Sequence, residues 1–246
     1  MSGHSHYATI KRKKEVTDAV KGRMFSKFSR AIAIAIKTGG GPDPEMNYKL
    51  RVAIDTAKAS NMPKSNIDRI LSKASEATQL DDVRYEGFGP DGIYVIVDVA
   101  TDNRNRSGQE IKNIFERGGG NLAGPNSVAY NFDPKGYILI AKTNNSEDQL
   151  LKLIDLGVED IKETDEDIEV YVDTASLSDI AQKVRECGYS IKEASLIMRP
   201  KTIQRIGDEN KAKKIIAFLD KLEENDDVQD VFTNFDIADA ILEKMV

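Results

Sequence analysis

The feature that most constrains the fold of this sequence is a change of hydrophobic period near residue 82. Before it, apolar residues recur at three- and four-residue steps, as Phe25, Phe28, Ile32 and Ile36 do. This spacing places them on one face of a helix. After it, residues 83–100 (VRYEGFGPDGIYVIVDVA) alternate with a period of two around a Gly-Pro-Asp-Gly turn, which predicts two strands. The sequence therefore predicts a helical beginning followed by mixed α and β structure.

Start and stop signals divide the helical part into three helices. The first ends at Gly39, and Asp43-Pro44-Glu45 is a start signal for a second that runs to about Ser60. Pro63 opens a third helix, predicted over 63–76. Because the connections are short, we expect a small three-helix bundle.

The rest of the chain shows a regular order of strands and helices. Segments that read as strand, helix, strand, strand, helix and strand follow one another at 136–142, 146–156, 158–163, 168–173, 176–187 and 190–198. This βαββαβ order is typical of ferredoxin-like domains. A helix at 104–117, a strand at 126–132 and the elements after residue 200 complete a second set.

The predicted fold class is therefore α+β, with an N-terminal three-helix domain and two ferredoxin-like α+β domains. The third domain is inserted in the second. The predicted domains are 1–79, 80–134 together with 200–246, and the inserted 135–199.

Bulk composition excludes several classes of protein. The chain is 40% hydrophobic and 31% charged, which suits folded domains, and no apolar run approaches the roughly 20 residues of a membrane span. Cys187 is the single cysteine, so an intramolecular disulfide and a cysteine-only metal site are excluded. The N-terminus has no apolar signal segment, and we expect a cytoplasmic protein without a membrane partner.

Charge is divided unevenly along the chain. Residues 1–74 carry 15 Lys and Arg against 6 Asp and Glu, a net charge of +9, whereas the remaining residues have a net charge of −15. A basic block joined to an acidic body indicates a polyanionic partner. Ordinary solvated helix faces are the alternative explanation.

The basic block supplies the candidate nucleic-acid contacts. At about 100° per residue, Arg23, Lys27, Arg30 and Lys37 fall on one side of a helix, opposite its apolar residues. Phosphate contacts by such cations release counterions, so affinity is expected to fall steeply with salt. Tyr7 is a candidate for stacking on a base. The full set is Tyr7, Lys11, Arg12, Lys13, Lys14, Lys21, Arg23, Lys27, Arg30, Lys37 and Lys64.

Two further motifs are candidate partner or anion loops. In residues 101–107 (TDNRNRS), Asp102, Asn103 and Asn105 are placed to cap a helix, which leaves Arg104 and Arg106 for an anion or an acidic neighbour. Residues 118–127 (GGGNLAGPNS), with Asn121, follow a helix instead of preceding one, so they do not form a phosphate-binding P-loop. A helix stop and a shaped partner surface are the expected roles of that segment.

No catalytic site emerges from the sequence. No nucleophile stands beside a base, and Cys187 has no histidine nearby. His4 and His6 are the only histidines, and a two-ligand metal site is weak. We expect a non-enzyme without metal, cofactor or small-molecule substrate.

A string of motifs in this chain resembles the YebC/PmpR family, whose mitochondrial relatives include the translational activator of cytochrome oxidase. The motifs are GHSHYATIKRKK, GRMFSKFSRAI, GGGPDPEMNYKLRVAIDTAKASNMPKSNI, RYEGFGPDG, TDNRNRS and GGNLAGPNSVAYNF. The match is collinear from residue 2 to about 133 and weaker beyond. Tyr7 and His6 replace the usual tryptophan and lysine, and the glycine-rich motif has an added proline.

The resemblance implies a three-domain fold without enzyme activity or cofactor. It also implies a regulator of gene expression, described either as a DNA-binding probable transcriptional regulator or as a ribosome-associated translation factor. The second kind would meet ribosomal or transfer RNA. The resemblance extends to the basic positions Lys11, Lys13, Lys14, Arg23, Lys27 and Arg30, and to the loop 61–64. A ligand-sensing regulatory protein is the third and least favoured alternative.

Overall fold

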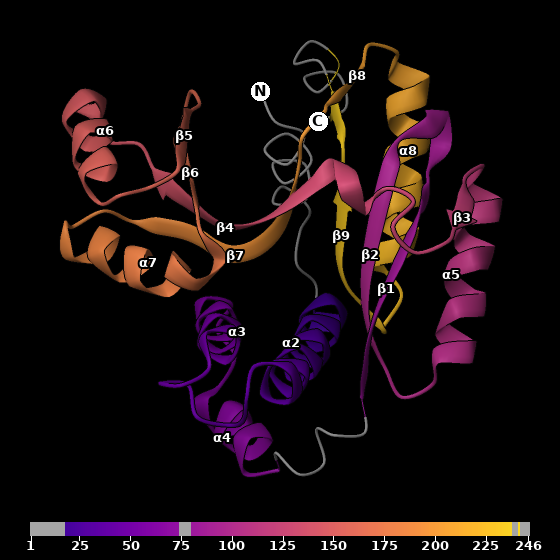
Figure 1. The fold of residues 1–246 in the computed structure, drawn as a ribbon, viewed down its shortest axis with the longest axis horizontal. Coiled ribbons are helices and arrows are strands. Elements are labelled where there is room, and N and C mark those ends of the chain that lie inside the picture. Colours follow the sequence, from indigo (N-terminus) through magenta and orange to yellow (C-terminus); the bar gives the residue numbers. More distant parts are fainter. Residues whose placement is uncertain (1–17, 74–79, 238–240, 242–246) are drawn as a thin grey trace. The chain divides into compact units, whose positions relative to one another are not determined.

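The structure, a computed structural model, describes residues 18–73, 80–237 and 241 (Figure 1). These residues group into two compact units. One unit contains residues up to 34 together with 78–133 and 199–246, and the other contains 35–77 and 134–198. Each unit is therefore assembled from segments that are far apart in the sequence.

Three helices lie near the start of the described chain. They are α2 (Asp18–Thr38), α3 (Tyr48–Ala59) and α4 (Lys64–Ser72). The predicted start of the second helix near residue 44 is wrong, because Asn47 is the residue that caps α3. Its Oδ1 accepts a hydrogen bond from the Leu50 amide at 3.0 Å, and its Nδ2 donates to the Ala35 carbonyl at 2.8 Å. Asn47 thereby joins the end of α2 to the start of α3.

The first sheet contains β1 (Asp81–Phe88), β2 (Tyr94–Thr101), β3 (Asn121–Ala123) and β9 (Val228–Thr233). Its order is β3-β1-β2-β9, and every neighbouring pair is antiparallel. Two helices, α5 (Arg104–Gly118) and α8 (Glu209–Glu223), pack against it (Figure 1). Buried residues of β2, including Val95 and Val97, form one core with Phe115 and Phe218 of these helices.

A small parallel pair completes the first unit. It consists of β8 (Gln204–Ile206) and β10 (Phe235–Ile237). The strand predicted at 126–132 is wrong: β3 ends at Ala123, and Ala129–Asn131 is a 3-10 turn. Glu86 explains the difference, because its carboxylate accepts hydrogen bonds from the amides of Asn126, Val128 and Ala129, which a strand would need for pairing.

The second sheet contains β4 (Phe132–Ala141), β5 (Asp160–Glu163), β6 (Asp167–Val172) and β7 (Ile191–Pro200). Its order is β5-β6-β4-β7, with α6 (Ser146–Asp155) between β4 and β5 and α7 (Leu177–Glu186) between β6 and β7. Alternate strand residues such as Ile138, Ile140 and Val170 are fully buried in its core. The predicted α+β class and the ferredoxin-like order of this region are confirmed. The three domain boundaries stay a prediction.

Candidate nucleic-acid interface

The cations of α2 divide into two kinds. Arg23 and Lys37 are exposed, whereas Lys27 and Arg30 are half-buried against other residues of the first unit. The Lys27 ammonium donates to the Glu223 carbonyl at 2.7 Å. Arg30 donates to the Asp226 carbonyl at 2.8 Å and forms an ion pair with Asp227. The helix face that the sequence predicts to be wholly available for phosphates is therefore partly engaged within the protein.

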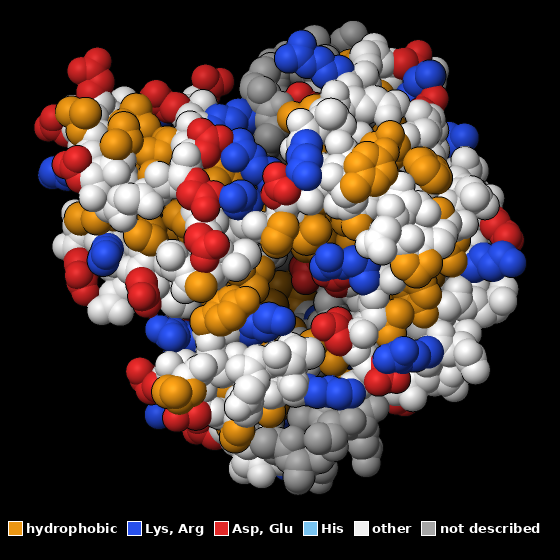
Figure 2. All heavy atoms as spheres, viewed as in Figure 1, with side chains coloured by type: hydrophobic (Ala, Val, Ile, Leu, Met, Phe, Trp, Pro, Cys, Tyr) orange, Lys and Arg blue, Asp and Glu red, His pale blue; other side chains and the backbone are white. Residues whose placement is uncertain are grey.

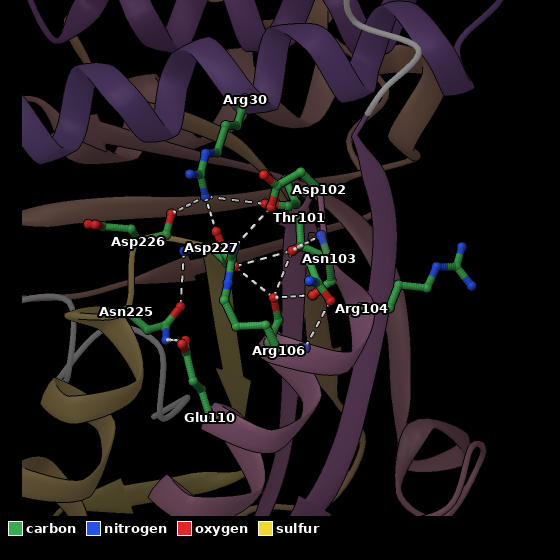
Figure 3. A network of polar contacts seen from close by, with 12 residues as sticks. Arg30, Thr101, Asp102, Asn103, Arg104, Arg106, Glu110, Asn225, Asp226 and Asp227 are labelled. Atoms are coloured by element: carbon green, nitrogen blue, oxygen red, sulfur yellow. Dashed lines mark hydrogen bonds and ion pairs between the residues drawn. The ribbon is translucent and has the colours of Figure 1, made fainter.

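Asp227 is the centre of this network (Figure 3). Its side chain is only 5% exposed, yet it carries a charge. One oxygen, Oδ2, accepts from Ser107 Oγ at 2.6 Å, from Arg106 Nη2 at 2.7 Å and from Thr101 Oγ1 at 3.2 Å. The other oxygen, Oδ1, faces Arg30. A buried carboxylate with this many donors is fully satisfied.

The electrostatics of Asp227 follow from these contacts. Burial alone would raise the pKa of its carboxyl group, but hydrogen bonds from Ser107, Arg106 and Arg30 outweigh burial and lower the pKa to about 2. The group is consequently ionised at neutral pH. It joins α2, the start of α5 and the segment before β9.

The segment 101–107 folds around the same acid. Asn103 caps α5, since its Oδ1 accepts from the Arg106 amide at 3.1 Å, as predicted. Arg104 Nε contacts Asp81 at 2.8 Å, and Arg106 Nη2 contacts Asp102 at 2.9 Å. Of the two predicted partners for these arginines, an anion or an acidic neighbour, the structure shows acidic neighbours.

The loop between α3 and α4 presents a second set of cations. Asn61 has a left-handed backbone (φ 61°), and Met62 is 5% exposed, so the loop is anchored in the core of its unit. Lys64 follows at the first turn of α4 and is exposed, as are Lys58 and Arg69.

Other predicted residues are placed differently. Asn121 is exposed in β3, and its backbone pairs with Phe88. Gly119 ends α5 with a left-handed conformation (φ 81°), which confirms the helix stop. Tyr7 and the run Lys11, Arg12, Lys13 and Lys14 lie outside the described residues, as does the side chain of Lys21.

The surface of the described residues mixes both signs of charge. Figure 2 shows Lys and Arg side chains interspersed with Asp and Glu on the face that it presents. Within the described ranges, no cluster of three or more His, Cys, Asp or Glu is arranged to hold a metal ion, and no helix is long and apolar enough to cross a membrane. Cys187 is exposed and not in a disulfide.

Comparison with known proteins adds the family. A model of the TACO1/YebC N-terminal domain matches residues 5–77, and a model of the TACO1/YebC second and third domain matches residues 80–235. The chain belongs to the TACO1/YebC family. The two matches are separated by residues 78–79.

Full-length relatives of this TACO1/YebC chain carry regulatory names. A probable transcriptional regulatory protein of Sulfurihydrogenibium sp. is 43% identical, over 100% of this chain and 99% of that protein. One of Aquifex aeolicus is 42% identical over the whole of both chains. The crystal structure of a conserved hypothetical protein from Aquifex aeolicus has a TM-score of 0.81 at 39% identity, covering 92% of this chain and 95% of that one.

Sequence reasoning missed two residues that organise this TACO1/YebC protein. Asp227 stands in an acidic run, ENDDVQD, which reads as a solvated turn. The only sequence signal is the apolar Val228 directly after Asp227. In the structure Val228 is fully buried, so this part of the run lies in the core. Glu86 lies in the strand motif RYEGFGPDG, where nothing in the alternation reveals that its carboxylate binds a loop 40 residues later.

Proposed function

We propose that this protein is a non-enzymatic regulator of gene expression that binds DNA through its basic N-terminal domain, in the cytoplasm. The observation that carries the proposal is the charge division, +9 in residues 1–74 against −15 in the remainder. Attraction of phosphates to the basic part raises affinity, and the net negative charge of the remainder directs most phosphate contacts to the basic part.

Among the described residues, the exposure of each cation indicates whether it can contact a phosphate. Arg23, Lys37 and Lys64 are exposed, and they supply phosphate contacts in this proposal. Lys27 and Arg30 are half-buried and bonded to the segment 223–227, so we assign them to holding α2 in place. Names of the full-length relatives, probable transcriptional regulatory proteins, support the regulatory part of the proposal.

A ribosome-associated translation factor is the second candidate. It is favoured by the small number of base-reading side chains on α4, a helix of nine residues whose longer polar groups are Lys64, Asn66 and Arg69. Contacts to phosphates alone give little sequence preference. This candidate predicts that the protein binds ribosomal or transfer RNA. It also predicts that DNA duplexes of unrelated sequence bind with the same affinity as one another.

The test is to replace Lys11, Arg12, Lys13 and Lys14 together by glutamate and measure affinity for a DNA duplex at two salt concentrations. We expect the native protein to lose affinity steeply with salt and the variant to lose binding at both concentrations. A matched control replaces four lysines of the acidic part, Lys112, Lys183, Lys213 and Lys221, and is expected to bind as the native protein does.

Unchanged affinity in the first variant, or equal loss in both, would overturn the proposal. Sedimentation of cell lysate through a sucrose gradient then separates the two candidates. Migration with ribosomes that is sensitive to salt and lost in the first variant supports the translation factor. A protein that stays at the top of the gradient while it prefers one DNA sequence over another supports the DNA-binding regulator.

A further inference from the structure

An exposed aromatic side chain stands on the first unit at a point where two sequence motifs meet. Tyr130 is 64% exposed, an unusual state for a large ring. It belongs to GGNLAGPNSVAYNF, whereas Phe88, at the end of β1, belongs to RYEGFGPDG. Neither motif has a role in the charge-based function proposed above.

The rings of these motifs form a connected series. Phe88 lies edge-on to Tyr94 with ring centres 5.6 Å apart, and Tyr94 lies 6.4 Å from Tyr130 at an angle of 58°. Phe88 and Tyr94 are half-buried, so the series runs from the end of the β1–β2 hairpin out to the solvent at Tyr130. A hydrogen bond with the Tyr94 side chain raises the pKa of Tyr130, which therefore stays neutral at physiological pH.

The backbone that carries Tyr130 is held on both sides. Before it, the amides of Val128 and Ala129 donate to the Glu86 carboxylate at 2.9 and 2.8 Å. After it, the Asn131 carbonyl accepts from the Lys201 amide at 2.7 Å. An exposed ring on a fixed backbone loses little conformational entropy when it binds a ligand.

A cation is bound to the backbone of Tyr130 itself. The Lys201 ammonium donates to the Tyr130 carbonyl at 3.0 Å and also lies 3.2 Å from Asp133, while its side chain remains 49% exposed. A preorganised aromatic face beside an exposed ammonium is the combination by which proteins hold single-stranded nucleic acid. The ring stacks on an unpaired base, and the cation contacts the backbone phosphate.

We infer that Tyr130 is a stacking platform for an unpaired nucleobase, with Lys201 contacting the adjacent phosphate. This inference rests on the proposed function. It adds that the first unit binds nucleic acid in single-stranded form. A protein partner that buries Tyr130 is the competing explanation, and it predicts no effect of Tyr130 on binding of a bare oligonucleotide.

The test uses two fluorescein-labelled probes, a 12-nucleotide oligo(A) RNA and a DNA duplex of the same length. Tyr130→Ala is expected to weaken binding of the single strand by about tenfold, the loss of one stacked base, and to leave duplex affinity unchanged. Lys201→Ala is expected to lower the slope of log affinity against log salt by about 0.7 for the single strand. Leu151→Ala, at a residue 61% exposed on α6, is the matched control and is expected to bind both probes normally.

A second measurement reports stacking directly. The chain contains no tryptophan, so Tyr130→Trp introduces a single reporter. We expect its emission to be quenched when oligo(A) binds. Unchanged emission while anisotropy shows binding, native affinity in Tyr130→Ala, or equal weakening of both probes would overturn the stacking inference while leaving the proposed function intact. A native protein that binds neither probe would overturn the proposed function itself.

Discussion

Two of the buried carboxylates in the first unit, Asp227 and Glu86, organise the chain in different ways. Asp227 is held by side chains, among them two arginines and a serine, and it joins α2 to α5 and to the segment before β9. Glu86 is held by three backbone amides and shapes the loop that ends at Tyr130. The pKa of Glu86 also lies below its ordinary value, because the three amides outweigh the opposing effect of burial.

The comparison shows which charged side chains form contacts within the protein and which are exposed to a binding partner. Cations that reach Asp227 are used inside the protein, so a count of cations on α2 overestimates the phosphate contacts. Glu86, in contrast, is held mainly by backbone amides, and these hydrogen bonds consume no side-chain cation. The predictions below test this distinction.

The largest effect is expected from Asp227→Ala. This change removes the charged acceptor that Arg30, Arg106 and Ser107 share, and we expect the free energy of unfolding to fall by about 3 kcal/mol. Urea denaturation followed by circular dichroism measures it. Asp226→Ala, the same charge change at the exposed neighbouring residue, is the control and should alter stability little. Equal stability of the two variants would contradict the central role of Asp227.

A somewhat smaller effect is expected from Glu86→Gln. The amide of glutamine presents a donor to amides that need an acceptor, which should cost about 2 kcal/mol. Hydrogen exchange of the Asn126, Val128 and Ala129 amides is expected to accelerate while that of β2 stays slow. Glu116→Gln, on the exposed face of α5, serves as control. Slow exchange of all three amides in Glu86→Gln would show that the loop does not depend on Glu86.

Acid should weaken the Asp227 site over a defined pH interval. Because the pKa of Asp227 is about 2 in the folded protein against 3.8 ordinarily, the unfolded chain binds a proton first as the pH falls. The contribution of this carboxylate is complete above about pH 5, falls as the pH drops from about 4 to about 2, and is lost below about pH 2. The stability difference between the native protein and Asp227→Asn is therefore expected to shrink over that interval. A difference that is constant from pH 5 to pH 2 would contradict the assigned pKa.

The smallest effects separate the two kinds of arginine. Arg30→Gln is expected to lower the free energy of unfolding by about 1.5 kcal/mol, since it leaves Asp227 short of a charged donor. Arg23→Gln should leave stability unchanged and weaken binding to a DNA duplex. Arg104→Gln breaks an exposed ion pair with Asp81 and should cost at most about 0.5 kcal/mol. Loss of stability in Arg23→Gln equal to that in Arg30→Gln would remove the distinction.

Much of the fold was predictable because it depends on local pattern. The alternation that defines β1 and β2, the order of elements in the second sheet and the Asn103 cap all follow from neighbouring residues. The conformation of the loop 126–129 after β3 was not predictable, since it depends on a carboxylate 40 residues earlier, that of Glu86. Asp227 could not be identified for the same reason: the donors to its carboxylate come from two distant segments, α2 and 101–107, and no local pattern indicates them. The sequence predicted the set of cations on α2. It did not predict that Lys27 and Arg30 form contacts within the protein.

The strand order of the first sheet bears on how the chain folds during synthesis. β1 and β2 emerge early, yet Val95 of β2 pairs with Thr233 of β9, near the end of the chain. The second sheet, by contrast, is complete once Pro200 has been made. We therefore expect the edge of β2 that pairs with β9 to remain unpaired while the second sheet forms. Nascent chains that stall after residue 200 should consequently be vulnerable to strand mispairing and to proteases.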